Sequence, residues 1–109
     1  MITLSTHVLD TAHGVPAAGV ELKLLRNGKL VFTGQTDADG RCPGLRDVAV
    51  DASAHRLEFA VADYFRARGV TLSDPPFLDV VAIEFGLSSG HYHVPLLVSP
   101  YGYSTYRGS

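Results

Sequence analysis

Three histidines are the residues of this 109-residue chain best suited to chemistry: His7, His91 and His93. An imidazole has an unperturbed pKa of ~6.5, so it can take up and release protons near neutral pH. His91 and His93 are two residues apart, so on a β-strand they share one face while their neighbours face the other way. If His93 lies in a pocket, His91 lies beside it or nearer the rim. Held rigidly on strands, these side chains could serve as general bases for attack by water.

Two other interpretations of the histidines remain open. Each could be a half-exposed strand residue without a role. Alternatively, His91 and His93 could bind zinc, with His7 or a distant acid as the third ligand. The other two histidines, His13 and His55, fall in loop-like segments, and we expect both at the surface.

The C-terminal segment YGYSTYRGS, residues 101–109, is rich in aromatic and hydrogen-bonding groups. Chain ends are usually frayed, but this composition favours an ordered segment that forms part of a site. Tyr106 and Ser109 could donate hydrogen bonds to a ligand. Tyr101 and Tyr103 alternate with a glycine, and we expect them to pack.

Two arginines could bind an oxygen-rich ligand. Arg41 follows a glycine-containing turn, and Arg107 lies in the C-terminal segment. Each could be a solvated charge, which the local sequence favours for Arg41, or a fork that binds a planar ligand or a developing oxyanion. Cys42 has no base close to it in sequence, so a cysteine nucleophile is not favoured. Attack by water with help from histidine needs only groups that are present.

These groups must be positioned by β-strands, because most of the sequence consists of strand-forming segments separated by turn residues. Asn27-Gly28 is a strong hairpin signal. A short helix over residues 63–68 would be capped by Ala62 or Asp63 and end at Gly69. An all-β, two-sheet antiparallel β-sandwich with one short helix is therefore expected, forming one domain over residues 1–109. The expected strands cover residues 2–9, 20–26, 30–36, 41–45, 57–61, 78–85 (in the centre of a sheet), 91–98 and 101–106.

Composition narrows the function classes. With 46% hydrophobic and 18% charged residues, disorder is not expected. A net charge of −2 gives no electrostatic case for binding nucleic acid or a membrane. The single cysteine rules out an internal disulfide and fits a reducing compartment. The sequence shows no signal-peptide pattern and no run of ~18 apolar residues, so we expect a cytoplasmic protein.

Three segments together resemble the 5-hydroxyisourate hydrolases, transthyretin-related enzymes of purine catabolism. They are LSTHVLDTAHGVPA at 4–17, TDADGR at 36–41 and the stretch from His91 to Ser109, which closes with the family's hallmark YRGS; PFLDVV at 76–81 also matches. The resemblance implies a transthyretin-like sandwich of about eight strands. It also implies a homotetramer, a dimer of dimers with active sites at the dimer–dimer interface. The implied reaction opens the lactam ring of 5-hydroxyisourate to give 2-oxo-4-hydroxy-4-carboxy-5-ureidoimidazoline, with no metal or organic cofactor.

The resemblance also implies roles for individual residues. Two histidines would activate a water, an arginine would stabilise the tetrahedral intermediate, and the tail would orient the substrate. Which histidine is the base stays open. A transthyretin-like carrier of small ligands is the alternative function, because a fold does not fix an activity. The implied catalytic residues are His7, Arg41, His93 and Ser109, and the implied substrate-binding residues are His7, Arg41, Tyr106, Arg107 and Gly108.

Overall fold

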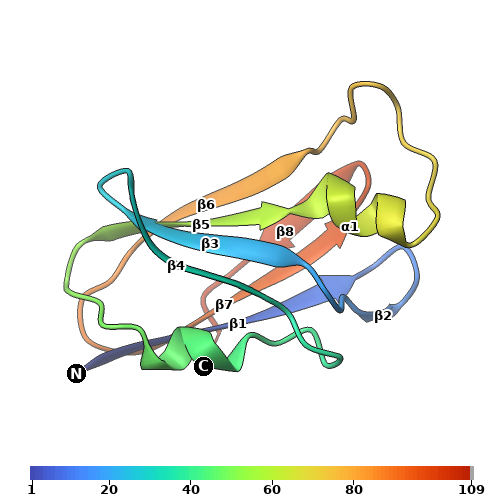
Figure 1. The fold of residues 1–109 in the computed structure, drawn as a ribbon. Helices are drawn as coiled ribbons and strands as arrows, with labels where there is room; N and C mark the ends of the chain where they lie inside the picture. Colours follow the sequence, from blue (N-terminus) through green and yellow to red (C-terminus); the bar gives the residue numbers. More distant parts are fainter. Residues whose placement is uncertain (109) are drawn as a thin grey trace.

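The computed structural model describes residues 1–108 and contains two four-stranded sheets packed face to face (Figure 1). One sheet has the order β2-β1-β7-β8 and the other β4-β3-β5-β6. The expected β-sandwich of eight strands is confirmed. The strands are β1 (Ile2–Asp10), β2 (Val15–Pro16), β3 (Glu21–Arg26), β4 (Lys29–Gln35), β5 (Ala54–Ala60), β6 (Val80–Gly86), β7 (Gly90–Ser99) and β8 (Gly102–Thr105); α1 (Val61–Ala67) follows β5, and the 3-10 helix η1 (Pro43–Asp47) follows β4.

Alternation along β1 and β7 decides which side chains enter the core. Leu4 and Val8 of β1 are buried, as are Val94 and Leu96 of β7, and they face the apolar side chains of the other sheet. Successive strand residues point to opposite faces. His7 and the other odd-numbered residues of β1 and β7 therefore lie on the outer face of this sheet. His91 and His93 share one face, as the sequence predicts.

One pairing differs from the expected antiparallel arrangement, because β1 and β7 run parallel. Their register places Thr3 opposite His91, Ser5 opposite His93, and His7 opposite Pro95. A parallel pair needs a long connection, and here almost the whole chain lies between the two strands. This register brings all three candidate histidines onto neighbouring strands of one face.

Three elements differ from the prediction. Residues 41–45 do not form a strand: Arg41 makes a single bridge to His7, and Pro43, which has no N–H to donate to a sheet, opens η1. The strand β6 lies at the edge of its sheet and not at its centre. Helix α1 begins at Val61 without a side-chain cap, so the expected caps are wrong; its first N–H groups donate to the carbonyl of Asp79 instead.

His55 is buried, with 2% of its surface exposed, so its expected surface position is wrong. Strand β5 starts at Ala54, three residues before the expected start, and this places His55 on the same inward face as Leu57 and Phe59. Its ring stacks on Phe85 with the ring centroids 6.4 Å apart.

None of the helices within residues 1–108 has the length and apolarity needed to cross a membrane.

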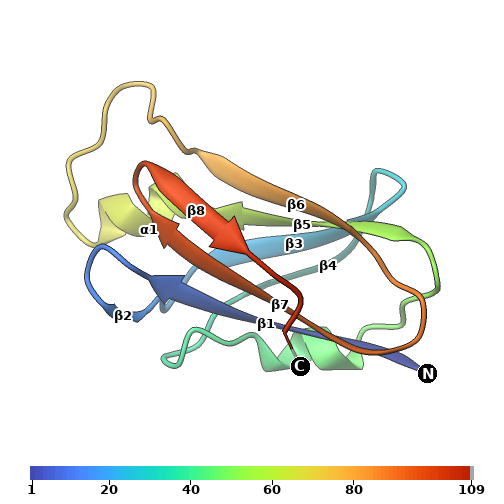
Figure 2. The same cartoon turned by 180° about the vertical axis from the view of Figure 1, so that it is seen from behind.

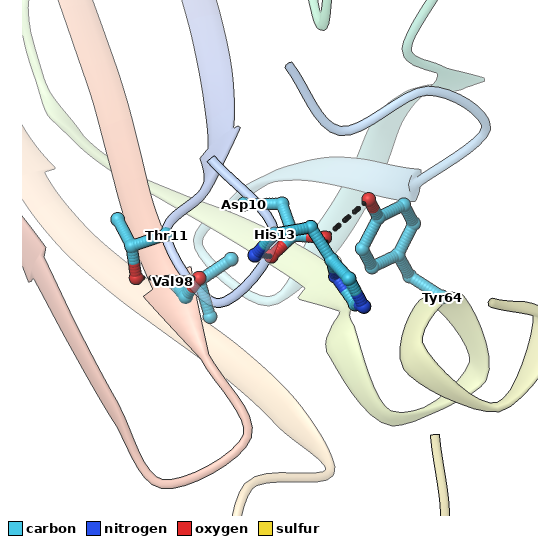
Figure 3. Close-up of polar contacts among 5 residues, drawn as sticks. All are labelled: Asp10, Thr11, His13, Tyr64 and Val98. Carbon is cyan, nitrogen blue, oxygen red and sulfur yellow. Dashed lines mark hydrogen bonds and ion pairs between the residues drawn. The ribbon is translucent and has the colours of Figure 1, made fainter. Parts of the chain in front are cut away.

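Asp10 anchors the end of β1 to the helix (Figure 3). Its buried carboxylate accepts hydrogen bonds from the Tyr64 hydroxyl at 2.8 Å and from the backbone N–H of His13 at 3.0 Å, and it pairs with the His13 ring at 2.6 Å. Burial by itself would raise the pKa of the Asp10 carboxyl, but these donors outweigh it and hold the pKa below its usual value. The same burial and the carboxylate raise the pKa of Tyr64 to about 12.

Tyr64→Phe is expected to lower the free energy of unfolding by ~1–3 kcal/mol at pH 7, because a buried carboxylate loses a donor. A carboxyl whose folded pKa is lowered contributes stability above its unfolded pKa of ~3.9, and that contribution is lost as the pH falls through the folded value. The difference in unfolding free energy between the variant and the intact protein should therefore shrink below about pH 4. Urea unfolding at fixed protein concentration measures this difference. Ser73→Ala, which removes an exposed hydroxyl from a loop, is the control. A loss of unfolding free energy that does not depend on pH would contradict the assignment.

Candidate active site

The candidate active site lies on the outer face of the β2-β1-β7-β8 sheet. Four segments meet there: β1, β7, the turn at residues 37–41, and the chain after β8. Figure 2 shows that last segment leaving β8 and running back along β7. A backbone bridge joins His7 to Arg41 and another joins His93 to Gly108, so both histidines are tied to segments distant in sequence.

The turn at residues 37–41 holds Arg41 beside His7. One carboxylate oxygen of Asp37 accepts hydrogen bonds from the backbone N–H groups of Asp39 and Arg41, at 2.9 and 3.0 Å. The carbonyl of Gly40 accepts a hydrogen bond from the N–H of Val8 at 2.8 Å. Gly40 has φ +76°, and a Cβ there would lie 2.4 Å from the Val8 carbonyl oxygen, so the turn requires glycine.

The same turn determines which ring nitrogen of His7 carries the proton. Nε2 of His7 lies 2.8 Å from the carbonyl oxygen of Asp39. A carbonyl can only accept a hydrogen bond, so Nε2 carries the proton. In the neutral ring, Nδ1 of His7 is then the nitrogen with a free lone pair.

His93 is held in the complementary way. Its Nδ1 lies 2.8 Å from the Ser5 hydroxyl, and Nε2 makes no hydrogen bond to any residue between 1 and 108. Burial lowers the pKa of the His93 imidazole, and the positive charge of Arg41 and the neighbouring His7 and His91 lower it further. His93 is therefore neutral at pH 7, the state that a general base requires.

The C-terminal segment reaches His93 through Gly108. The Gly108 N–H donates to the His93 carbonyl at 2.7 Å, in the same register that pairs Leu96 with Thr105 in β7 and β8. Pro95 has no N–H, so the ladder is interrupted between these two points. A Cβ on Gly108 would lie 2.7 Å from Cδ2 of the His93 ring, so the glycine lets the tail pass directly against the imidazole.

Gly108→Ala should therefore displace the His93 ring or the tail. We expect a loss of kcat of up to ~10²-fold with an unchanged thermal midpoint, because a small misplacement of a reacting group is costly while the core is untouched. The activity assay described below measures the loss. Gly102→Ala is the matched control, since a Cβ there would meet only the Ser99 hydroxyl at 3.9 Å. Equal activity of the two variants would contradict the tight contact.

Tyr106 and Arg107 make no hydrogen bond to the His93 ring in the single chain. The Arg107 guanidinium lies 3.8 Å from the ring centroid of Tyr92 and 3.5 Å from the His91 carbonyl. Tyr106 is 60% exposed. Ser109 lies outside the residues that the structure describes. The structure thus brings His7, Arg41, His93 and Gly108 together, and it directs Arg107 elsewhere.

Tyr101 and Tyr103 do not pack in the core, so that expectation is wrong for the chain by itself. Tyr101 is 67% exposed and Tyr103 is 47% exposed. The Tyr101 ring has Phe77, itself 69% exposed, as a neighbour at a centroid distance of 6.2 Å. Both tyrosines belong to an aromatic surface at the β8 end of the sheet.

Two hydroxyl residues of the site escaped the sequence analysis. Ser5 contacts both His91 and His93, and Thr3 contacts His91. Their period of two with His7 places them on the same face, and this much can be read from the sequence. Their pairing with β7 depends on the parallel register, which no local signal specifies.

Neither a zinc site nor a reactive thiol is supported by the described residues. Across residues 1–108, no group of three or more histidine, cysteine, aspartate or glutamate side chains is placed to hold a metal ion. Cys42 is buried beside Arg41, and burial raises the pKa of its thiol. A cysteine with a raised pKa is a poor nucleophile at neutral pH.

Comparisons with known proteins agree with this fold. A profile of the HIUase/Transthyretin family matches residues 4–108. The curated 5-hydroxyisourate hydrolase of Caulobacter vibrioides is 51% identical, and the alignment covers all of both chains. The solved 5-hydroxyisourate hydrolase of Klebsiella pneumoniae superposes with a TM-score of 0.89 at 35% identity, over all of both chains. Sea bream transthyretin, solved in complex with thyroxine, superposes with a TM-score of 0.84 at 32% identity, over 97% of this chain and 94% of that one.

Proposed function

Because this chain belongs to the HIUase/Transthyretin family, we propose that it hydrolyses 5-hydroxyisourate at the outer face of β1 and β7. The product is 2-oxo-4-hydroxy-4-carboxy-5-ureidoimidazoline. One observation carries the proposal: two imidazoles, within reach of the Arg41 charge, each have one ring nitrogen bonded to the protein and the other without a hydrogen bond to residues 1–108. This arrangement suits hydrolysis by general acid–base catalysis.

The reaction follows from these groups. His7 and His93 position a water, and one of them takes its proton as the oxygen attacks the lactam carbonyl. Arg41 binds substrate oxygens and stabilises the negative charge of the tetrahedral intermediate. The carbon–nitrogen bond then breaks, and an imidazolium returns the proton to the leaving nitrogen. Tyr106, Arg107, Gly108 and Ser109 complete the binding of the substrate.

The proposal also covers the assembly. A homotetramer built as a dimer of dimers would place this open face between dimers, and Arg107 and Tyr106 could turn toward the substrate there. The exposed rings of Tyr101, Tyr103 and Tyr106 support burial by a second copy. Residues 1–109 act in the proposal as one domain, in the cytoplasm, without a metal or an organic cofactor.

The direct test adds the purified protein to freshly generated 5-hydroxyisourate and follows the ultraviolet decay of the substrate against buffer. Accelerated decay that persists in the presence of a strong chelator is expected. Saturable binding of the substrate or of thyroxine without acceleration would favour the small-ligand carrier, which the likeness to sea bream transthyretin keeps as the alternative.

A further inference from the structure

A line of alternating hydroxyl and imidazole groups extends from His93 along the outer face of the sheet. The Ser5 hydroxyl lies 2.8 Å from Nδ1 of His93 and 3.0 Å from Nε2 of His91. Nδ1 of His91 lies 2.7 Å from the Thr3 hydroxyl. All four residues are half-buried. The general-base mechanism uses only the first of them, so the other three need an explanation.

The chemistry of these groups allows the whole line to reverse. A hydroxyl can donate one hydrogen bond while it accepts another, and a neutral imidazole has one nitrogen of each kind. In one direction His93 donates from Nδ1 to Ser5, Ser5 donates to Nε2 of His91, and His91 donates from Nδ1 to Thr3. In the other direction each bond is reversed, and the proton of His93 resides on Nε2. Both states keep all three hydrogen bonds of the line.

We propose that Ser5 and His91 relay the proton that His93 takes from the attacking water, so that the positive charge comes to rest on His91 and not beside Arg41. This inference rests on the proposed function. Ser5 and His91 are positioning residues, because they act through His93 and do not touch the substrate.

The proton balance of the relay is complete. Nε2 of His93 accepts the proton of the water as the oxygen–carbon bond forms. The Nδ1 proton of His93 passes to Ser5, and the Ser5 proton passes to Nε2 of His91, which becomes an imidazolium that donates to Thr3. When the carbon–nitrogen bond breaks, the line runs backwards and Nε2 of His93 protonates the leaving nitrogen.

Electrostatics favour this displacement of charge. The groups that face His93 are Arg41 from the turn, His7 from β1 and His91 from β7, and together with burial they lower the pKa of its imidazole. Two further positive charges lie near His91. The Arg107 guanidinium touches the His91 backbone carbonyl and not its ring. The amino group belongs to Met1, whose carbonyl accepts a hydrogen bond from the Gly90 N–H next to His91. Arg41 bridges to His7, and the register places His93 opposite Ser5 and His91 opposite Thr3. A proton on His91 is thus two residues farther along the strands from Arg41 than a proton on His93.

The test compares kcat, KM and the pH profile of Ser5→Ala, His91→Gln and Ser5→Thr with the intact protein. Removing the relay should lower kcat by ~10–100-fold, a part of the ~10²–10⁴-fold that general acid–base catalysis supplies, with KM unchanged. Without the relay, the proton must stay beside Arg41. The acidic limb of kcat/KM should therefore move to lower pH in Ser5→Ala and His91→Gln, and Ser5→Thr, which keeps the hydroxyl, should restore most of kcat.

Thr11→Val is the matched control. The Thr11 hydroxyl also bonds β7, by donating to the Val98 carbonyl, but Thr11 follows the far end of β1. A merely structural role of Ser5 would lower activity without moving the acidic limb. Unchanged kcat and an unchanged limb in Ser5→Ala and His91→Gln would overturn the relay.

A measurement independent of turnover separates the relay from the proposed function. Nitrogen-detected NMR of the histidine rings should show His93 as the Nδ1–H tautomer at high pH, and its change to the Nε2–H tautomer as His91 takes up a proton. His91→Gln should abolish this change of tautomer. If the intact protein does not accelerate the decay of 5-hydroxyisourate, the proposed function fails. An unchanged His93 titration in both variants would by itself overturn the relay.

Discussion

Replacing His93 with glutamine is expected to lower kcat/KM for 5-hydroxyisourate by ~10²–10⁴-fold, the usual effect of removing a general base. Nε2 of His93 makes no hydrogen bond to residues 1–108, and the lowered pKa of the imidazole keeps the ring neutral at pH 7. Glutamine retains polar atoms near the ring position but cannot exchange protons near pH 7. Initial rates of ultraviolet decay measure the effect.

The pH dependence of kcat/KM gives a second test of His93 as the general base. Because the pKa of His93 is lowered, the basic form persists below the ordinary value of ~6.5. Where the proton stays on His93, as in Ser5→Ala, the acidic limb of kcat/KM should therefore lie below pH ~6.5. In the intact protein the proposed relay should place this limb at a higher pH than in Ser5→Ala. His13→Gln, a change at a histidine bound to Asp10 and outside the site, is the control. A His93→Gln variant with the activity of the control would remove His93 from the mechanism.

Replacing Arg41 with alanine is expected to lower kcat by ~10²–10³-fold, which is typical of losing one donor to an oxyanion. The bridge to His7 and the hydrogen bonds with Asp37 fix the backbone of Arg41. The substitution should therefore remove the guanidinium and leave the conformation of the turn unchanged. Arg41→Lys keeps the charge but not the planar fork, and it should recover only part of the activity.

Arg46→Ala is the matched control for Arg41. Both side chains line one hollow of about 240 Å³ beside Ser5, and both are exposed arginines. Arg46 lies in η1 and makes no bridge to a histidine strand. If Arg46→Ala lost as much activity as Arg41→Ala, the effect would reflect the net positive charge of the hollow and not oxyanion binding by Arg41.

Local patterns predicted the parts of the fold that depend on neighbours in sequence. Asn27-Gly28 forms the hairpin turn between β3 and β4, with φ values of 51° and 75°. Gly69, with φ +83°, follows the last turn of α1. The period of two along a strand likewise places Thr6 and Val8 on the opposite face of β1 from His7, and the structure shows that theirs is the buried face.

Properties that depend on long-range pairing were not predictable in this way. An apolar run fits a central strand and an edge strand equally well, so β6 was misplaced. The burial of His55 depends on where β5 starts, and the bridge of Arg41 to His7 depends on a turn docking against β1. Each of these is decided by contacts between residues far apart in the chain.

The candidate site likewise has features that the sequence predicts and features that only the tertiary structure shows. By itself the sequence determined which residues can do the chemistry, because imidazole, guanidinium and the closing YRGS motif are properties of residue type and order. Only the tertiary structure decided that Ser5 stands between two imidazoles and that Gly108 passes against His93. The physical reason is that the parallel register of β1 and β7 is fixed by packing across the whole chain, and no local segment encodes it.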